Sequence, residues 1–399
     1  MNPRLEILKP YPFERLNALK AGVVTTTNLP HVALSIGEPK HLPPDFVLDR
    51  LTDATLVRRD LAMYPATRGS IELRTAIADW ISSRFGAKVN PDNAILPVSG
   101  TREALFSFGL ALLSGQPGSI AILPNPFYQI YEGAILLGGA NPFFLTGNPD
   151  RHYQPDFESI PEAVWQATEL LFLCSPSNPN GSVLPEAHLR WLIEQAHRYD
   201  FVIAADECYS EIYLNESSPP TGLLEASERM GNAGHRHCVV FHSLSKRSNL
   251  PGLRSGFVAG DAEILERYFL YRTYEGCALP AHVQAASELA WRDEAHVITN
   301  RAAYRRKFEA VRKVAPAVAP RVDPAGGFYW WVPTPIDDEL FTKRLFQQEN
   351  VTVLPGSYLG RTGPDGTNPG QNHVRIAWVA ELMECQDAAG RLQRFMTSL

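Results

Sequence analysis

Cysteine is scarce in this sequence, and its few residues form no cluster. Cys174, Cys208, Cys238, Cys277 and Cys385 lie far apart, with no CxxC pair and no cysteine and histidine at metal-ligand spacing. An odd number of widely spaced cysteines is typical of free thiols in a reducing compartment. We therefore expect neither a disulfide framework nor a bound metal.

Long apolar runs and an excess of positive charge are also missing. No segment approaches the roughly 20 apolar residues that a membrane-spanning helix needs. The N-terminus carries Glu6, Pro10 and Pro12 where a signal peptide would need its apolar stretch. The formal net charge is -6 and the isoelectric point about 6.0, so no global positive field attracts nucleic acid or an anionic membrane. We expect a cytoplasmic protein that binds neither nucleic acid nor a membrane.

What is present is the composition of an ordinary globular protein, with 45% hydrophobic and 20% charged residues in a chain of 399. Apolar segments that read as strands alternate with helical segments from about residue 94. Strands that are apolar throughout and separated by helices predict an α/β fold with a mostly parallel sheet covered by helices on both faces. The predicted strands are 94–98, 120–123, 141–145, 170–174, 201–205, 238–241 and 256–260, and helices begin at Thr101, near Tyr128 and at Pro185.

The two ends of the chain predict a second, smaller α+β domain. The proline-rich arm 1–45 is too short to form its own core, and a long helical stretch from Ala281 to about Val314 precedes a strand-rich end. We assign 46–285 to a large cofactor-binding domain, and 1–45 with 286–399 to the small one. Ser70 is the expected N-cap of a helix. The glycine-rich segment 356–371 is expected to be a surface excursion.

Polar groups follow several predicted strands, at the edge where a parallel sheet binds its ligands. Gly100, Thr101 and Arg102 lead into a helix, where free backbone N–H groups and the helix dipole favour a phosphate. Three other strand ends carry Tyr128, Asn178, and Asp206 with Tyr209. We expect these groups to line one crevice.

Lys246 follows a fifth strand and lies between the hydroxyls of Ser243 and Ser245, with Arg254 eight residues later. Only a neutral lysine amine can attack a carbonyl to form a Schiff base, and desolvation lowers a lysine pKa. The serines and the arginine would then form a phosphate clamp. Taken alone, the segment is equally compatible with a solvated surface turn.

A Schiff-base lysine, a phosphate pocket, an aspartate and a flat aromatic ring are the groups that pyridoxal phosphate requires. Asp206 can keep the pyridine nitrogen protonated, because a nearby opposite charge favours the charged form. Asn178 and Tyr209 can hydrogen-bond the ring oxygen, and Tyr128 can stack on the ring. Singly, these residues are compatible with roles as a cap, a turn former and core aromatics. Together they predict a site for this cofactor.

Four motifs resemble, in order and spacing, those of the class I/II aminotransferases of the aspartate aminotransferase superfamily. They are Ser-Asn-Pro-Asn-Gly at 177–181, Asp-Glu-Cys-Tyr at 206–209, Ser-Leu-Ser-Lys at 243–246 with Arg254, and His-Val-Arg at 373–375. The resemblance runs from about Leu34 to the C-terminus. It implies the fold type I of pyridoxal-phosphate-dependent transferases and a homodimer with shared active sites.

The resemblance also implies a role for each site residue. Lys246 would bind the cofactor and move the proton of the substrate α-carbon, with Asp206 at the ring nitrogen. The phosphate would be held by Gly100, Thr101, Ser243 and Arg254, with Arg102 and Ser245 beside it and Tyr64 reaching the phosphate of the neighbouring subunit. Arg375, helped by Asn178 and the backbone of Gly37, would bind the substrate α-carboxylate, a bidentate task that suits a guanidinium.

Three segments, 2–13, 34–41 and 243–256, resemble more narrowly the bacterial succinyldiaminopimelate aminotransferases of lysine biosynthesis. The implied reaction converts N-succinyl-LL-2,6-diaminopimelate and 2-oxoglutarate to N-succinyl-2-amino-6-oxopimelate and glutamate. The second negative end of this substrate needs a cation, for which Arg272 and Lys40 are candidates. Tyr128 stands where the aspartate enzymes have tryptophan, which disfavours aspartate as the substrate.

Other functions stay open at this point. The motifs serve the cofactor more than the substrate, so another amino-acid aminotransferase or a pyridoxal-phosphate-dependent C–S lyase would carry them too. A non-enzymatic regulator of the same fold is disfavoured, because the chain has no basic extension and no spare length for a helix-turn-helix.

Overall fold

The computed structural model describes residues 1–321 and 323–399, and a single large sheet dominates its fold. Its strand order is β2-β9-β8-β7-β6-β3-β4-β5. Neighbouring strands from β8 to β4 are parallel, whereas β9 runs antiparallel to both of its neighbours and β5 runs antiparallel to β4. The strands are β2 (Ile95–Val98), β3 (Ile120–Asn125), β4 (Asn141–Asn148), β5 (Gln154–Pro155), β6 (Thr168–Cys174), β7 (Val202–Asp206), β8 (Cys238–Ser243) and β9 (Gly256–Gly260). The predicted mostly parallel α/β sheet is confirmed.

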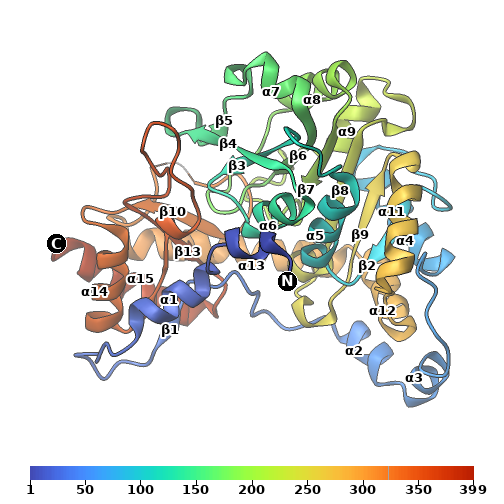
Figure 1. The fold of residues 1–399 in the computed structure, drawn as a ribbon. Helices are drawn as coiled ribbons and strands as arrows, with labels where there is room; N and C mark the ends of the chain where they lie inside the picture. Colours follow the sequence, from blue (N-terminus) through green and yellow to red (C-terminus); the bar gives the residue numbers. More distant parts are fainter. Residues whose placement is uncertain (322) are drawn as a thin grey trace.

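Helices cover both faces of this sheet (Figure 1). Successive residues of a strand point to opposite faces. Accordingly, Ile203 and Ala205 of β7 belong to one apolar core, and Val202 and Ala204 belong to the other. The first core includes side chains of α4 (Ile71–Phe85), α7 (Glu162–Ala167), α8 (Glu186–Tyr199), α9 (Leu223–Arg229) and α12 (Ala281–Arg292). The second includes side chains of α5 (Thr101–Leu112), α6 (Gln129–Gly138) and α11 (Ala262–Glu275).

A smaller unit has its own sheet and its own core. Its three-stranded antiparallel sheet has the order β10-β13-β12, and β1 pairs in parallel with β11 nearby. The strands are β10 (Tyr329–Pro333), β12 (Leu354–Pro355), β13 (His373–Ala377), β1 (Val32–Ala33) and β11 (Val351–Thr352). Helices α13 (Ala295–Val314), α14 (Asp338–Glu349) and α15 (Leu382–Thr397) pack on them.

The N-terminal arm touches both units (Figure 1). Its 3-10 helix η1 (Pro3–Ile7) lies against α6 of the large unit, and α1 (Pro12–Lys20) lies against α14 of the small one. Beyond β1 the chain returns to the large unit through α2 (Asp45–Thr52) and α3 (Ala54–Asp60). None of the described helices combines the length and the apolar character needed to cross a membrane.

The long helix predicted from Ala281 to Val314 is two helices, because the chain turns at Asp293 and Glu294 between α12 and α13. Helix α12 packs on α4 and α2 of the large unit. The predicted division between residues 285 and 286 therefore falls inside α12. We propose to place the domain boundary between α12 and α13 instead.

The segment 356–371, expected on the surface, is partly buried. Gly356 and Tyr358 of η6 (Gly356–Tyr358) and the following Leu359 are buried, and the Leu359 carbonyl accepts a hydrogen bond of 3.0 Å from the amide of Phe127. The segment closes over the end of β3, and Arg361 forms an ion pair of 2.6 Å with Glu132.

Candidate active site

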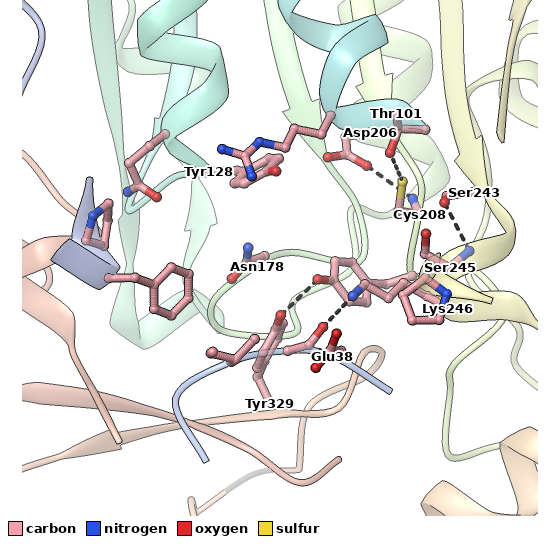
Figure 2. Close-up of a pocket in the computed structure, with 18 of the residues that line it drawn as sticks. Glu38, Thr101, Tyr128, Asn178, Asp206, Cys208, Ser243, Ser245, Lys246 and Tyr329 are labelled. Atoms are coloured by element: carbon pink, nitrogen blue, oxygen red, sulfur yellow. Dashed lines mark hydrogen bonds between the residues drawn. The ribbon is translucent and has the colours of Figure 1, made fainter. Parts of the chain in front are cut away.

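The carboxyl ends of the parallel strands and the small unit enclose a cleft of about 510 Å³ (Figure 2). Strand ends β3, β6, β7 and β8 contribute Tyr128, Asn178, Asp206 and Ser243, whereas β13 of the small unit contributes Arg375. The predicted site residues that line it are Gly37, Thr101, Arg102, Tyr128, Asn178, Asp206, Tyr209, Ser243, Ser245, Lys246, Arg254 and Arg375. The structure thus brings most of the predicted residues together.

Lys246 lies on the short helix α10 (Leu244–Arg247), directly after β8. The Ser243 hydroxyl caps this helix by accepting a hydrogen bond of 3.1 Å from the Ser245 amide. The Lys246 Nζ donates to the carbonyl of Gly37. Burial, with a smaller contribution from the nearby charge of Arg375, lowers the pKa of Lys246 to about 8. More of this amine is therefore neutral at pH 7 than in an exposed lysine, and the neutral form is the one that Schiff-base chemistry requires.

Gly37 can approach Lys246 because glycine has no side chain. A Cβ at this position would lie 1.9 Å from the hydroxyl of Tyr329. Any other residue would displace either the tyrosine or the backbone carbonyl that Lys246 contacts. Glycine is required here for close approach.

Asp206 ends β7 and is buried, which by itself raises the pKa of its carboxyl. The Tyr131 hydroxyl donates to one carboxyl oxygen at 2.7 Å, and the Cys208 amide donates to the other at 3.2 Å. Both hydrogen bonds favour the anion and oppose the effect of burial. An anion in this place fits the protonated ring nitrogen of pyridoxal phosphate.

The start of α5 and the loop before β9 form an anion cradle. Gly100 has a φ of +92°, and Thr101 begins the helix with its free backbone N–H groups. A Cβ on Gly100 would lie 2.2 Å from a terminal nitrogen of the Arg254 guanidinium, so glycine keeps room for the arginine. Ser243 and Ser245 line the same part of the cleft. This donor set fits a phosphate group, as predicted.

Arg375 is a buried cation whose partners are neutral. Its terminal nitrogens donate to Asn178 Oδ1 and to the carbonyl of Ser35, both at 2.7 Å, and its guanidinium lies 4.4 Å from the ring centroid of Tyr329. Its Nε has no hydrogen-bond partner in the described chain. Because a buried charge without a counter-ion is costly, this guanidinium is poised to accept a carboxylate from a ligand.

Four of the predicted residues are outside the cleft lining: Gly100, which lies beside Arg254, and Tyr64, Arg272 and Lys40. Arg272 is fully buried, where it pairs with Glu103 and donates to the carbonyl of Cys277 at 2.9 Å. The prediction that Arg272 binds the distal end of the substrate is wrong for this chain, because its charge is already neutralised within the large unit. Tyr64 is fully exposed, so its predicted contact with a neighbouring subunit stays a prediction.

The other candidate cation for the distal end, Lys40, is exposed and pairs with Glu38 at 2.7 Å. Glu38 lines the cleft and Lys40 does not. The assignment of Lys40 also stays a prediction.

Sequence reasoning missed three side chains that shape the site. Tyr131 holds Asp206, and Tyr329 shares a hydrogen bond of 2.9 Å with the hydroxyl of Tyr209. Cys208 Sγ lies 3.0 Å from the hydroxyl of Thr101. The spacing of three residues from Tyr128 could have indicated Tyr131, because such residues share a helix face. Nothing local distinguished Tyr329 from a core aromatic.

Comparisons with known proteins agree with this geometry. A family model described as aminotransferase class I and II matches residues 30–392. An LL-diaminopimelate aminotransferase of Dehalococcoides mccartyi is 30% identical over 406 residues, covering 99% of this chain and 98% of the relative. Another of the same name, from Nitratidesulfovibrio vulgaris, is 28% identical over 398 residues, covering 98% of this chain and 97% of the relative.

Solved structures are similar over the full length as well. The crystal structure of an aminotransferase from Neisseria meningitidis superposes with a TM-score of 0.93 at 46% identity, covering 99% of this chain and all 100% of that one. The aminotransferase AspB from Helicobacter pylori superposes with a TM-score of 0.90 at 35% identity, covering 98% and 100%.

Proposed function

The chain belongs to the class I and II aminotransferases, which depend on pyridoxal phosphate, and we propose that its substrate is N-succinyl-LL-2,6-diaminopimelate with 2-oxoglutarate as amino acceptor. The observation that carries the proposal is a cleft that holds both Lys246 and Arg375. The lysine has a lowered pKa, and the buried arginine has no carboxylate partner among the described residues. Arg102, predicted to lie beside the cofactor phosphate, also lines this cleft, and we propose that it binds the distal end of the substrate instead.

The cofactor, when bound, supplies a ring that withdraws electrons from the substrate α-carbon. The residues present would hold each part of it. The phosphate would lie at the α5 N-terminus with Thr101, Ser243 and Arg254. Asp206 would face the ring nitrogen, and Asn178 with Tyr209 would face the ring oxygen.

The proton transfer is the task of Lys246. With pyridoxal phosphate bound, Lys246 Nζ would be the group that accepts the proton of the substrate α-carbon and gives it up again. A pKa of about 8 suits this double role, because a base and acid works best when its pKa is near the working pH. The carbonyl of Gly37 gives the amine a fixed acceptor.

Substrate orientation is the task of Arg375. A planar guanidinium binds a carboxylate through two parallel hydrogen bonds, which fixes direction as well as position. Asn178 and the Ser35 carbonyl hold two of its nitrogens at 2.7 Å, so the side chain is preorganised. The α-carbon would then lie between Arg375 and Lys246.

The distal end of the substrate decides between two diaminopimelates. The free amino acid has a distal ammonium and a distal carboxylate, whereas the succinylated one has two distal carboxylates and an amide. Arg102 is exposed, lies 5.2 Å from the ring centroid of Tyr11, and forms no ion pair within the described residues. The exposed acid of the cleft lining, Glu38, is already paired with Lys40. This charge balance favours the succinylated substrate.

The names of the relatives support the second candidate, free LL-diaminopimelate. The purified protein loaded with cofactor would be given each diaminopimelate with 2-oxoglutarate, and glutamate would be measured. We expect kcat/KM for the succinylated compound to be about tenfold higher or more, which corresponds to about 1.4 kcal/mol.

Two variants make this test sharper. Arg102→Gln should reduce the preference by raising KM for the succinylated donor, whereas Arg58→Gln, which changes an exposed arginine outside the cleft lining, should not. Faster turnover of free LL-diaminopimelate would replace the proposal with the second candidate. Release of pyruvate and a thiol from a β-thio amino acid, without glutamate formation from either diaminopimelate, would indicate a C–S lyase.

A further inference from the structure

Asn300 lies outside the cleft lining, near the start of α13, yet it holds the backbone of Lys246. Its Nδ2 donates to the carbonyls of Lys246 and Arg247, each at 3.2 Å. Its Oδ1 accepts from Asn249 Nδ2 at 2.9 Å and lies 2.7 Å from His41 Nδ1. A carboxamide has two donors and two acceptor sites. All four are used, in a side chain that is only 5% exposed.

These partners come from separate parts of the chain. Lys246 and Arg247 belong to α10, and His41 ends the loop 36–41 of the N-terminal arm. The same loop carries Gly37, whose carbonyl accepts from Lys246 Nζ. The result is a closed hydrogen-bond network. Asn300 binds the backbone of Lys246, the carbonyl of Gly37 accepts from its amine, and His41 links Asn300 to the loop that carries Gly37.

The direction of the hydrogen bond between His41 and Asn300 is defined. Asn300 Oδ1 can only accept, so His41 Nδ1 must carry the proton. His41 Nε2 is buried and has no hydrogen-bond partner among the described residues, and burial lowers the pKa of this histidine, an effect that the charge of Lys307 increases. The ring is therefore neutral, with its single proton on the atom that faces Asn300. Its packing 4.7 Å from the ring of Tyr304 fixes its orientation.

We propose that Asn300 is a positioning residue that sets where Lys246 Nζ lies relative to the Gly37 loop. Loss of its carboxamide would free the carbonyls of Lys246 and Arg247 and would uncouple α10 from the loop 36–41. The amine would then move toward water, and its share of neutral form near pH 7 would fall because desolvation would no longer be complete. The inference depends on Lys246 acting through its amine and is independent of the substrate chosen above.

The test measures the Lys246 amine in the enzyme without cofactor. Competitive acetylation across a pH series, read by mass spectrometry of the Lys246 peptide, gives the pKa of this amine directly. We expect Asn300→Ala to raise it by about one unit, and to slow the capture of added pyridoxal phosphate near pH 7. The folded state would be checked by circular dichroism.

A matched control lies one turn earlier on the same helix. His296 Nε2 is 2.8 Å from the hydroxyl of Ser248, the residue after α10, and no hydrogen bond among the described residues joins the His296 side chain to Lys246 or to the loop 36–41. His296→Asn should therefore leave the Lys246 pKa unchanged. An unchanged pKa in folded Asn300→Ala, or an equal shift in both variants, would overturn the proposal.

A second variant covers the case in which Asn300→Ala does not fold. His41→Phe keeps an aromatic ring against Tyr304 and removes only the link between Asn300 and the loop 36–41. It should raise the Lys246 pKa by less than Asn300→Ala does. An unchanged Lys246 pKa in this variant would again contradict the proposed hydrogen-bond network.

Discussion

At the scale of single residues, the hydroxyl of Tyr131 supports the site by its hydrogen bond to Asp206. It is fully buried, its ring stacks on Phe172 with centroids 4.9 Å apart, and its O–H donates to Asp206. Burial raises the pKa of Tyr131 far above its usual value, so it stays protonated and remains a donor. This donor opposes the upward shift that burial imposes on the Asp206 pKa.

We predict that Tyr131→Phe weakens cofactor binding while preserving the ring stack. A hydrogen bond to a buried charge contributes about 1.5–3 kcal/mol, so the dissociation constant for pyridoxal phosphate should rise about 10- to 100-fold. Fluorescence titration of the enzyme without cofactor measures it. Because the Asp206 pKa would rise further, the loss should be larger at pH 6 than at pH 8. Equal losses at both values would contradict this role for Tyr131.

The second prediction at this scale concerns the pH dependence of Lys246. Because burial lowers its pKa to about 8, the amine loses its proton as the pH rises through that value. The rate at which the enzyme without cofactor captures pyridoxal phosphate should therefore increase with pH and level off above it. Stopped-flow absorbance measures this rate. Lys246→Ala should abolish both the covalent absorbance and nearly all turnover, and retention of either would contradict the assignment.

At the scale of elements, two helices begin where the site needs backbone donors. Helix α5 starts at Thr101, after the turn that follows β2, and the short helix α10 starts at Leu244 directly after β8. The free backbone donors at the start of α4 are satisfied by a side chain instead. The predicted cap Ser70 accepts a hydrogen bond of 3.2 Å from the Leu73 amide. The sequence prediction of this cap is confirmed.

We predict that Ser70→Ala lowers the free energy of unfolding by about 1 kcal/mol, the usual effect of losing such a cap. The backbone amide of Ser70 still donates to Gln284 Oε1 in the variant, so the loss is confined to the side chain. A lower thermal midpoint at fixed protein and cofactor concentration is the expected result. Ser70→Asp retains a capping oxygen and should stay close to the unmodified protein; a drop as large as that of the alanine variant would argue against capping.

At the scale of the whole molecule, the site exists only because two units meet. Arg375 comes from β13 of the small unit and Asn178 from the loop after β6 of the large one, and they are joined by a hydrogen bond. Exposed apolar and aromatic side chains, including Leu42, Leu61, Met63, Tyr64 and Tyr274, remain on the described surface. We expect a second copy of the chain to cover part of this surface and to bring Tyr64 to the phosphate cradle.

We predict that Tyr64→Phe raises the dissociation constant for pyridoxal phosphate about tenfold, the effect of one lost hydrogen bond to a charged group. Sedimentation analysis should find a dimer for both proteins, so that the effect is separated from assembly. Tyr274→Phe, at an equally exposed tyrosine, serves as control and should bind the cofactor normally. A monomer that binds the cofactor with undiminished affinity would contradict the shared site.

The sequence by itself determined the sheet, the cofactor chemistry and most of the cleft residues. The reason is that parallel strands are continuous apolar runs, and their carboxyl ends meet at one edge, so Thr101, Tyr128, Asn178, Asp206 and Lys246 could be placed together from order alone. Tertiary structure alone decided how side chains distant in sequence pair. It placed Arg272 against Glu103 instead of in the cleft, put Tyr131 on Asp206, and joined Asn300 to His41. The pairings of Arg272 and Asn300 depend on the packing of separate elements, for which a linear pattern carries no signal, whereas the spacing of Tyr131 from Tyr128 could have indicated its place.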